Sequence, residues 1–128
     1  MAAGGVPLPD VLAAENTILS ALEMQEFLQM RFAERTAKNL PALQMRAGIN
    51  SGKVVAGIVG VKKFQYDIWG DTVNTASRME ATCEKGMVNI SNVTYSHVYS
   101  NRNFKFINRG MVEVKGKGEM ELFYVSRA

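Results

Sequence analysis

Two polar side chains near the middle of the chain have the types and spacing of a pair that acts on a phosphoryl group. Asn74 and Arg78 lie in segment 72–83, whose pattern predicts a helix with Asp71 as its N-cap. A spacing of four places the amide and the guanidinium on one helix face, near the positive end of the helix dipole. Such a pair can stabilise negative charge through charge-assisted hydrogen bonds. On geometry alone, an ordinary solvated helix face is the favoured interpretation.

The opposite face of this predicted helix is apolar and would pack against the rest of the protein. Its members recur at helical spacing: Thr72, Ala76, Met79 and Cys83. The cysteine is the only one in the chain, so an internal disulfide is excluded and a reducing compartment is indicated. A lone cysteine in such a pattern is usually a small core residue.

Two further charged positions could contact a nucleotide. Asp67 lies in the otherwise apolar run 65–69, where an unpaired carboxylate is costly to bury. It is either a surface residue of an edge strand or an acceptor for an exocyclic amino group. Lys115 and Lys117 lie on the glycine-rich turn 115–118. Lysines there usually protect a sheet edge, but they also provide a cation for a triphosphate.

The sequence patterns of the segments around these residues predict an α+β fold. Periodic apolar residues predict a long helix over 10–38, ended by Asn39 and Pro41. Runs 43–50 and 53–59, divided by a Ser-Gly turn, predict a hairpin. Short strands and helices fill the remainder: strand 87–90, helix 91–99 opened by Ser91 or Asn92, and strands 104–114 and 121–125. Together they predict a largely antiparallel sheet with helices packed on one face.

Composition indicates one intracellular globular domain, 1–128. The chain has 128 residues, 47% of them hydrophobic, and a mild net charge of +3 with no long basic run. Charge alone therefore does not indicate nucleic acid. No apolar run is long enough to span a bilayer, and the first residues do not form a signal peptide. Residues 1–6 look like the tail of a strand, which suggests that sequence upstream is missing.

Three motifs resemble those of class III adenylyl and guanylyl cyclases. They are Arg-Ala-Gly-Ile-Asn-Ser-Gly at 46–52, the stretch 65–80 that contains Tyr-Asp-Ile-Trp-Gly-Asp-Thr-Val-Asn, and Val-Lys-Gly-Lys-Gly at 114–118. Their order and spacing match the family over residues 1–125, nearly the whole chain. The resemblance implies a ferredoxin-like cyclase catalytic domain from which the N-terminal strands are missing.

The resemblance also implies how the purine is bound. Asp67 matches the position that accepts a hydrogen bond from the adenine amino group. Guanylyl cyclases usually have another residue there, often cysteine, so Asp67 indicates an adenylyl cyclase. Ile68 and Trp69 match positions that line the nucleotide pocket.

Asn74 and Arg78 match the two residues that stabilise the transition state, and Lys115 matches the lysine that binds the terminal phosphates. Lys117 is its neighbour and is not assigned that role. In this family the ribose 3′-hydroxyl attacks the α-phosphorus of ATP and pyrophosphate leaves, so the enzyme is a phosphorus–oxygen lyase. Two metal ions, Mg²⁺ or Mn²⁺, assist. The site forms between two catalytic domains, in a homodimer or a heterodimer.

The sequence departs from the family pattern at its beginning. The metal-binding aspartates, and the lysine that would partner Asp67, are expected upstream of Met1. Asp10 and Asp71 are poor substitutes, because neither has a second carboxylate beside it. No metal ligand is therefore assigned, none of the metal ions is expected to bind tightly to this chain, and the chain alone is expected to be inactive.

Two interpretations of function follow, and a third fails. The chain is part of an active, cytoplasmic adenylyl cyclase, free or as the cytosolic part of a larger membrane or sensor protein. Alternatively, it is a non-catalytic partner that binds nucleotide or a complete cyclase subunit. An RNA-binding module is disfavoured, because no strand carries the paired exposed aromatic residues that stack bases. We therefore expect ATP and a second cyclase domain as partners, with no nucleic acid and no membrane contact by this chain.

Overall fold

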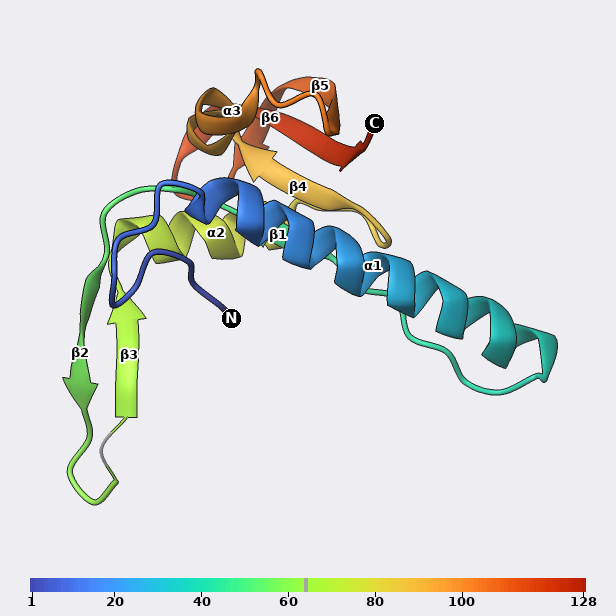
Figure 1. The fold of residues 1–128 in the computed structure, drawn as a ribbon, viewed down its shortest axis with the longest axis horizontal. Coiled ribbons are helices and arrows are strands. Elements are labelled where there is room, and N and C mark those ends of the chain that lie inside the picture. Colours follow the sequence, from blue (N-terminus) through green and yellow to red (C-terminus); the bar gives the residue numbers. More distant parts are fainter. Residues whose placement is uncertain (64) are drawn as a thin grey trace.

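The computed structural model describes residues 1–63 and 65–128 and shows a mixed α+β fold (Figure 1). The α+β class predicted from the sequence is confirmed. Helices and strands follow in the order α1 (Ala13–Ala37), β1 (Ala47–Ile49), β2 (Val55–Val59), β3 (Gln65–Trp69), α2 (Asp71–Ala81), β4 (Val88–Ser91), α3 (Asn92–Val98), β5 (Phe104–Val114) and β6 (Gly118–Arg127).

The strands form two separate sheets. The larger has the order β1-β4-β6-β5, in which β1 is parallel to β4 and the other neighbours are antiparallel. The smaller is the antiparallel ribbon of β2 and β3, which extends away from the body of the molecule in Figure 1. A largely antiparallel arrangement is therefore confirmed, with one parallel pair where β1 joins β4.

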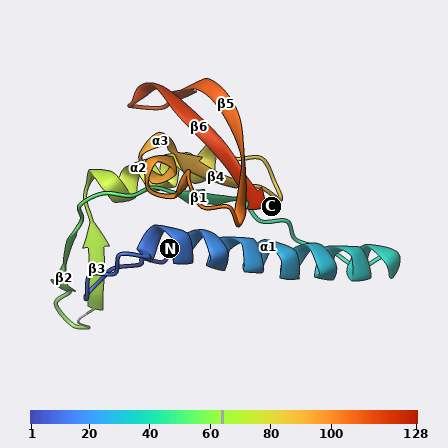
Figure 2. The ribbon, with the colours of Figure 1, turned by 45° about the horizontal axis from the view of Figure 1, so that its top comes forward.

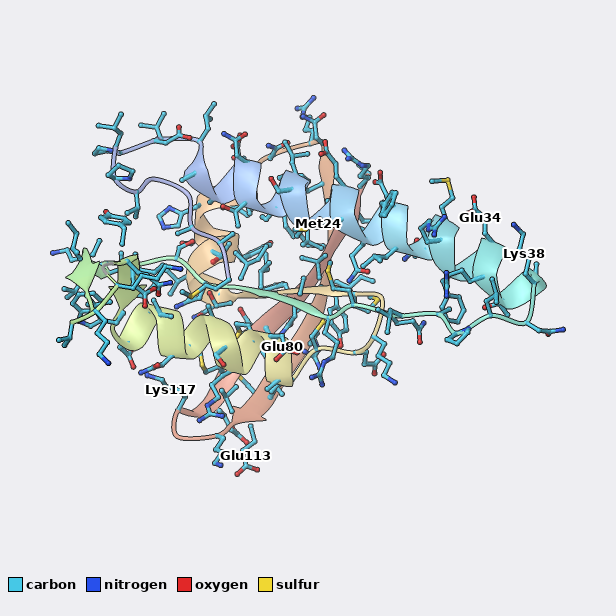
Figure 3. The ribbon with its side chains drawn as sticks, turned by 90° about the horizontal axis from the view of Figure 1, so that it is seen from below. Met24, Glu34, Lys38, Glu80, Glu113 and Lys117 are labelled. Carbon is cyan, nitrogen blue, oxygen red and sulfur yellow. The ribbon has the colours of Figure 1, made fainter. Side chains whose placement is uncertain are left out.

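Helices cover both faces of the larger sheet, not one face as the sequence analysis expected. Seen from below, β1 passes between α1 and α2 (Figure 3). The main core lies on the side of α1 and α3, and its buried members include Ile18, Leu22, Ile49, Val88, Ile90, Val98, Phe104, Phe123 and Val125. A smaller core of Met79, Val114 and Leu122 lies on the α2 side. Alternation along β6 explains the division, because Leu122 and Phe123 point to opposite faces.

Helix α1 confirms the predicted long amphipathic helix, with ends at Ala13 and Ala37. Its first half buries Ile18 and Leu22 against the sheet, whereas its second half extends past the sheet (Figure 2). The two halves meet near Gln25, which is buried and donates to the carbonyl oxygens of Met45 at 2.8 Å and Met87 at 2.9 Å. No helix in the two described ranges is long and apolar enough to cross a membrane.

The predicted hairpin between 43–50 and 53–59 is wrong. Only residues 47–49 of the first run form a strand, and β1 pairs with β4, about forty residues later in the chain. Strand β2 pairs instead with β3, in the register Gly57 opposite Asp67. The Ser51-Gly52 step is therefore a passage from one sheet to the other rather than a hairpin turn.

Smaller expectations had mixed outcomes at the ends of elements. Ser91 is confirmed as the N-cap of α3, where its Oγ accepts the N–H of Thr94 at 3.3 Å. Asp71 is not an N-cap: it is the first residue of α2, after Gly70. Residues 1–6 form no strand. Strand β6 is longer than the predicted 121–125 because it pairs with β5 along nearly its whole length.

Helix α2 lies unusually close to β1 at Gly48. A Cβ atom at this position would lie 2.0 Å from the backbone nitrogen of Glu80 and 2.4 Å from the carbonyl carbon of Met79. Both neighbours are helix backbone and cannot move aside as a flexible side chain could. Only glycine therefore allows α2 to pack at this depth.

We predict that Gly48→Ala destabilises the protein by about 2 kcal/mol or more, because the added methyl group must push α2 off the sheet. Urea unfolding followed by circular dichroism measures the effect. Gly57→Ala is the matched control, since its Cβ would meet only the ring edge of Trp69 at 3.5 Å. Equal stability of the two variants would contradict the close packing of α2 on β1.

Candidate active site

The predicted site residues lie on three elements that adjoin one another. Strand β3 ends at Trp69 and α2 begins at Asp71, so only Gly70 separates the predicted purine-binding and phosphoryl-binding segments. The turn between β5 and β6 lies beside α2 in Figure 3, where Lys117 is labelled. Lys117 forms an ion pair with Asp71 and thereby holds this turn near the start of the helix.

The two faces of β3 present different predicted residues. Tyr66 and Ile68 line a cleft of about 700 Å³ between the first residues of the chain, the start of α1 and the first half of α2. Asp67 and Trp69 do not line this cleft, because successive residues of a strand point to opposite sides. The structure therefore separates Ile68 from the other two predicted purine contacts.

The outer face of the ribbon combines a carboxylate with an indole. Asp67 is exposed, and its Oδ1 accepts the N–H of Ile68 at 2.8 Å. Its cross-strand neighbour is Gly57, so no side chain crowds it from β2. The Trp69 ring edge lies 3.5 Å from the position of a Cβ on Gly57, beside the space above Asp67. This face offers a hydrogen-bond acceptor beside an aromatic surface.

On α2, the predicted pair Asn74 and Arg78 lies one helical turn apart. Asn74 is exposed and Arg78 is half-buried. Neither side chain forms a hydrogen bond or an ion pair with residues 1–63 or 65–128. Both are thus available to a ligand. Asn74 lies at the positive N-terminal end of the helix, which favours an anion, whereas Arg78 lies in the last turn and not near that end as the sequence predicted.

The buried stripe of α2 differs from the predicted one in part. Met79 is buried as expected, and Cys83 is buried just beyond the helix, but Thr75 takes the third buried position. Thr72 and Ala76 are only partly buried and line the cleft. The helix is therefore rotated slightly from the predicted orientation.

The two lysines of the β5–β6 turn have different surroundings. Lys117 is engaged by Asp71. Lys115 is exposed and has no ion-pair partner in the described part of the chain. Of the two, Lys115 is the cation without an ion-pair partner among the described residues, and its role toward the terminal phosphates stays a prediction from the family resemblance.

The described residues do not fit a metal site. Within 1–63 and 65–128, no group of three or more His, Cys, Asp or Glu side chains is placed to hold a metal ion. Mg²⁺ prefers an octahedral set of oxygen ligands, commonly one or two carboxylates with waters and substrate phosphates. A metal in the complete enzyme stays a prediction.

The sequence analysis missed a group of polar residues around the first turn of α2. Asn50, Thr72 and Ser91 are linked there by hydrogen bonds of 2.6–3.1 Å. Polar residues following two neighbouring parallel strands would have been the signal, since such strand ends meet at one edge. That signal depends on the pairing of β1 with β4, which the predicted hairpin excluded.

Comparison with known proteins identifies the family to which this chain belongs. Residues 1–127 match the adenylate and guanylate cyclase catalytic domain. The chain belongs to this family. It is 43% identical to soluble guanylate cyclase 89Db of Drosophila melanogaster over 125 residues, which are 98% of this chain and 18% of that protein.

Solved cyclase domains of both specificities share the fold. The guanylate cyclase domain of RhGC from Catenaria anguillulae, in complex with GTP, is 35% identical with a TM-score of 0.85, over 97% of this chain and 65% of that one. The adenylyl cyclase CyaB from P. aeruginosa is 25% identical with a TM-score of 0.87, over 98% and 65%. The chain thus spans under a fifth of its Drosophila relative and about two thirds of these solved domains.

Burial also affects the end of α2, through Cys83. Loss of hydration raises the pKa of this buried thiol above its ordinary value of 9.0. The thiol donates to the carbonyl oxygens of Glu84 at 3.2 Å and Met87 at 3.3 Å. The folded protein therefore retains this proton at a pH where the unfolded chain releases it.

We predict that the free energy of unfolding falls as the pH rises above about 9, since the raised thiol pKa stabilises the fold only while the unfolded chain keeps its proton. Urea unfolding at pH 7.5 and 9.5 measures the fall. In Cys83→Ala the fall should be smaller, while other titrating groups still contribute. Identical pH dependence in the two proteins would show that Cys83 has an ordinary pKa.

Proposed function

We propose that this chain supplies the purine-binding and transition-state half of an adenylyl cyclase site, which converts ATP to cyclic AMP and pyrophosphate. The main support for the proposal is the arrangement on β3 and α2. A carboxylate and an indole lie on the strand, and the helix that follows carries an amide and a guanidinium that have no partner among the described residues. Membership of the cyclase family supports the reaction class.

The choice of ATP rests on Asp67. A carboxylate accepts hydrogen bonds, and the family resemblance, rather than this property alone, assigns it to the adenine amino group, since guanine also presents N–H donors. Its Oδ1 is held by the N–H of Ile68, which orients the group, and Oδ2 has no partner among the described residues. Similarity alone does not choose the base, because similar proteins include cyclases named for either nucleotide.

Helix α2 carries the residues proposed to act on the phosphoryl group. The 3′-hydroxyl loses its proton, which ends on the pyrophosphate or in solvent, as its oxygen bonds to the α-phosphorus and the bond to the pyrophosphate oxygen breaks. Negative charge then grows on the oxygens around phosphorus. The amide of Asn74 and the guanidinium of Arg78 can donate to those oxygens from one side of the helix. Lys115 is available to bind the departing pyrophosphate.

The site needs a complement from a second cyclase domain. The ribbon of β2 and β3 shows why association is favourable: it is a separate two-stranded sheet with exposed apolar residues on it. Val55 is 55% exposed, Ile58 72% and Tyr66 55%. Such a ribbon is marginal alone in water, and a partner that covers it would stabilise it.

A second candidate function is a non-catalytic partner that binds nucleotide or a complete cyclase subunit. The lack of a carboxylate group fit for metal within the two described ranges favours it for this chain in isolation. The two proposals differ in turnover: only the first expects cyclic AMP once a domain with metal-binding aspartates is present.

We predict that Asp67→Cys, in a protein with the complete catalytic domain, lowers the ratio of cyclic AMP to cyclic GMP formed from equal ATP and GTP by roughly tenfold, the worth of one hydrogen bond to the base. Product ratios at subsaturating substrate give the result. Glu23→Cys removes another exposed carboxylate, on α1 and away from the cleft, and should leave the ratio unaltered. An unchanged ratio in Asp67→Cys would remove this residue from base selection.

We predict that Arg78→Ala lowers kcat by roughly 10²-fold to 10³-fold, because a donor to the transition state is lost. Its melting temperature should stay within a few degrees of the parent value, since the guanidinium has no partner in the described structure. Arg102→Ala, an exposed position after α3, is the matched control. Unfolding of Arg78→Ala at ambient temperature would mean that this arginine is structural.

A further inference from the structure

The first turn of α2 is held by the loop that follows β1. The backbone carbonyl of Thr72 accepts the side-chain N–H of Asn50 at 3.1 Å, and the hydroxyl of Thr72 donates to the carbonyl of Lys53 at 2.6 Å. Gly52 closes the arrangement, because a Cβ there would lie 2.6 Å from the same hydroxyl oxygen. We name these four residues, Asn50, Gly52, Lys53 and Thr72, the Thr72 clasp.

A second hydrogen bond fixes the orientation of the Asn50 amide. Its Oδ1 accepts the hydroxyl of Ser91 at 2.6 Å, so that its Nδ2 faces Thr72. Ser91 is fully buried and also caps α3 through the N–H of Thr94. The hydroxyls of Ser51 and Thr94, 2.9 Å apart, link the same loop to α3. Through Asn50 and Ser91 the clasp is therefore anchored in the larger sheet, whereas its bond to the Lys53 carbonyl lies at the surface.

The clasp and Gly48 together fix α2 at two points. In the parallel pairing of β1 with β4, Gly48 pairs with Asn89, and alternation places Gly48 and Asn50 on the face toward α2. Gly48 sets the depth of the helix at Met79 and Glu80, and Asn50 sets the position of its first turn. Asn74 and Arg78 lie between these attachments.

We propose that Thr72 and Asn50 are positioning residues for Asn74 and Arg78 in the reaction assigned above, a proposal that rests on the proposed function. A helix is stiff, and Asn74 is only about 3 Å along the axis from Thr72. A small shift of the first turn therefore moves the amide and guanidinium by a similar amount, and displacements near 1 Å can lower turnover about 10²-fold. The clasp also ties the base of the ribbon that carries Asp67 to the same turn.

Thr72→Val and Thr72→Ser form the decisive pair, because valine keeps the shape of threonine without the hydroxyl and serine keeps the hydroxyl donor without the methyl group. In the protein with the complete catalytic domain, we expect Thr72→Val to lower kcat by roughly tenfold or more with little change in KM, and Thr72→Ser to retain most of it. Asn50→Asp removes the donor to Thr72 but keeps an acceptor for Ser91, and should resemble Thr72→Val. Ser96→Ala, which removes an equally short hydroxyl-to-carbonyl bond on α3, should have no effect.

Hydrogen exchange of this chain gives a readout independent of turnover. We expect the amides of residues 73–78 to exchange faster in Thr72→Val than in Thr72→Ser, with β4 and β6 unchanged. Equal exchange in the two variants, or equal kcat, would overturn the proposal. If the parent protein makes no cyclic nucleotide, the proposed function fails, whereas faster exchange in Thr72→Val alone would still show that the clasp holds the helix.

Discussion

The backbone contact between α2 and β1 fixes the position of α2, and the position of α2 determines where the neighbouring elements lie. Gly48 lets the helix lie directly on the strand, and no larger residue fits between them. The helix covers the small core of Met79, Val114 and Leu122 on one side of the sheet, while α1 and α3 cover the main core on the other. Only Gly70 separates the end of β3 from the start of α2. The position of α2 therefore sets where the two-stranded ribbon leaves the rest of the molecule.

The placement of α2 leaves the proposed nucleotide contacts on its exposed side. The sheet side of α2 is taken up by packing, so its outer side presents Asn74 and Arg78 without partners in the described structure. The preceding strand presents Asp67 and Trp69, and an ion pair brings the Lys115 turn to the same helix end. Purine, phosphoryl and pyrophosphate groups of one nucleotide thus have candidate contacts on β3, α2 and the turn between β5 and β6. In the proposed function, the chain supplies one side of a site that it shares with a second cyclase domain.

Local sequence signals predicted the local structure well and the long-range pairing poorly. The periodicity of α1, the Ser91 cap and the turn before β6 depend on residues close in the chain, and the structure confirms each of them. The hairpin prediction failed because the partner of β1 is a strand beyond α2, and a glycine-containing step such as Ser51-Gly52 looks like a turn wherever the chain goes next. The Thr72 clasp was missed for the same reason. The roles of the site residues came from motif resemblance, which depends on the order of residues and not on their surroundings; the structure adds those surroundings.

A complementation assay would show whether this chain supplies the transition-state half of a cyclase site. This chain would be mixed with the CyaB adenylyl cyclase domain in which the residues corresponding to Asn74 and Arg78 are both alanine, and cyclic AMP formed from ATP would be measured, with association verified by size-exclusion chromatography. We predict that neither protein alone is active and that the mixture is active. This chain would supply the transition-state residues, and the CyaB variant would supply the metal-binding residues. A stable complex that forms no cyclic AMP would contradict the assignment of this chain as the transition-state half of a cyclase site.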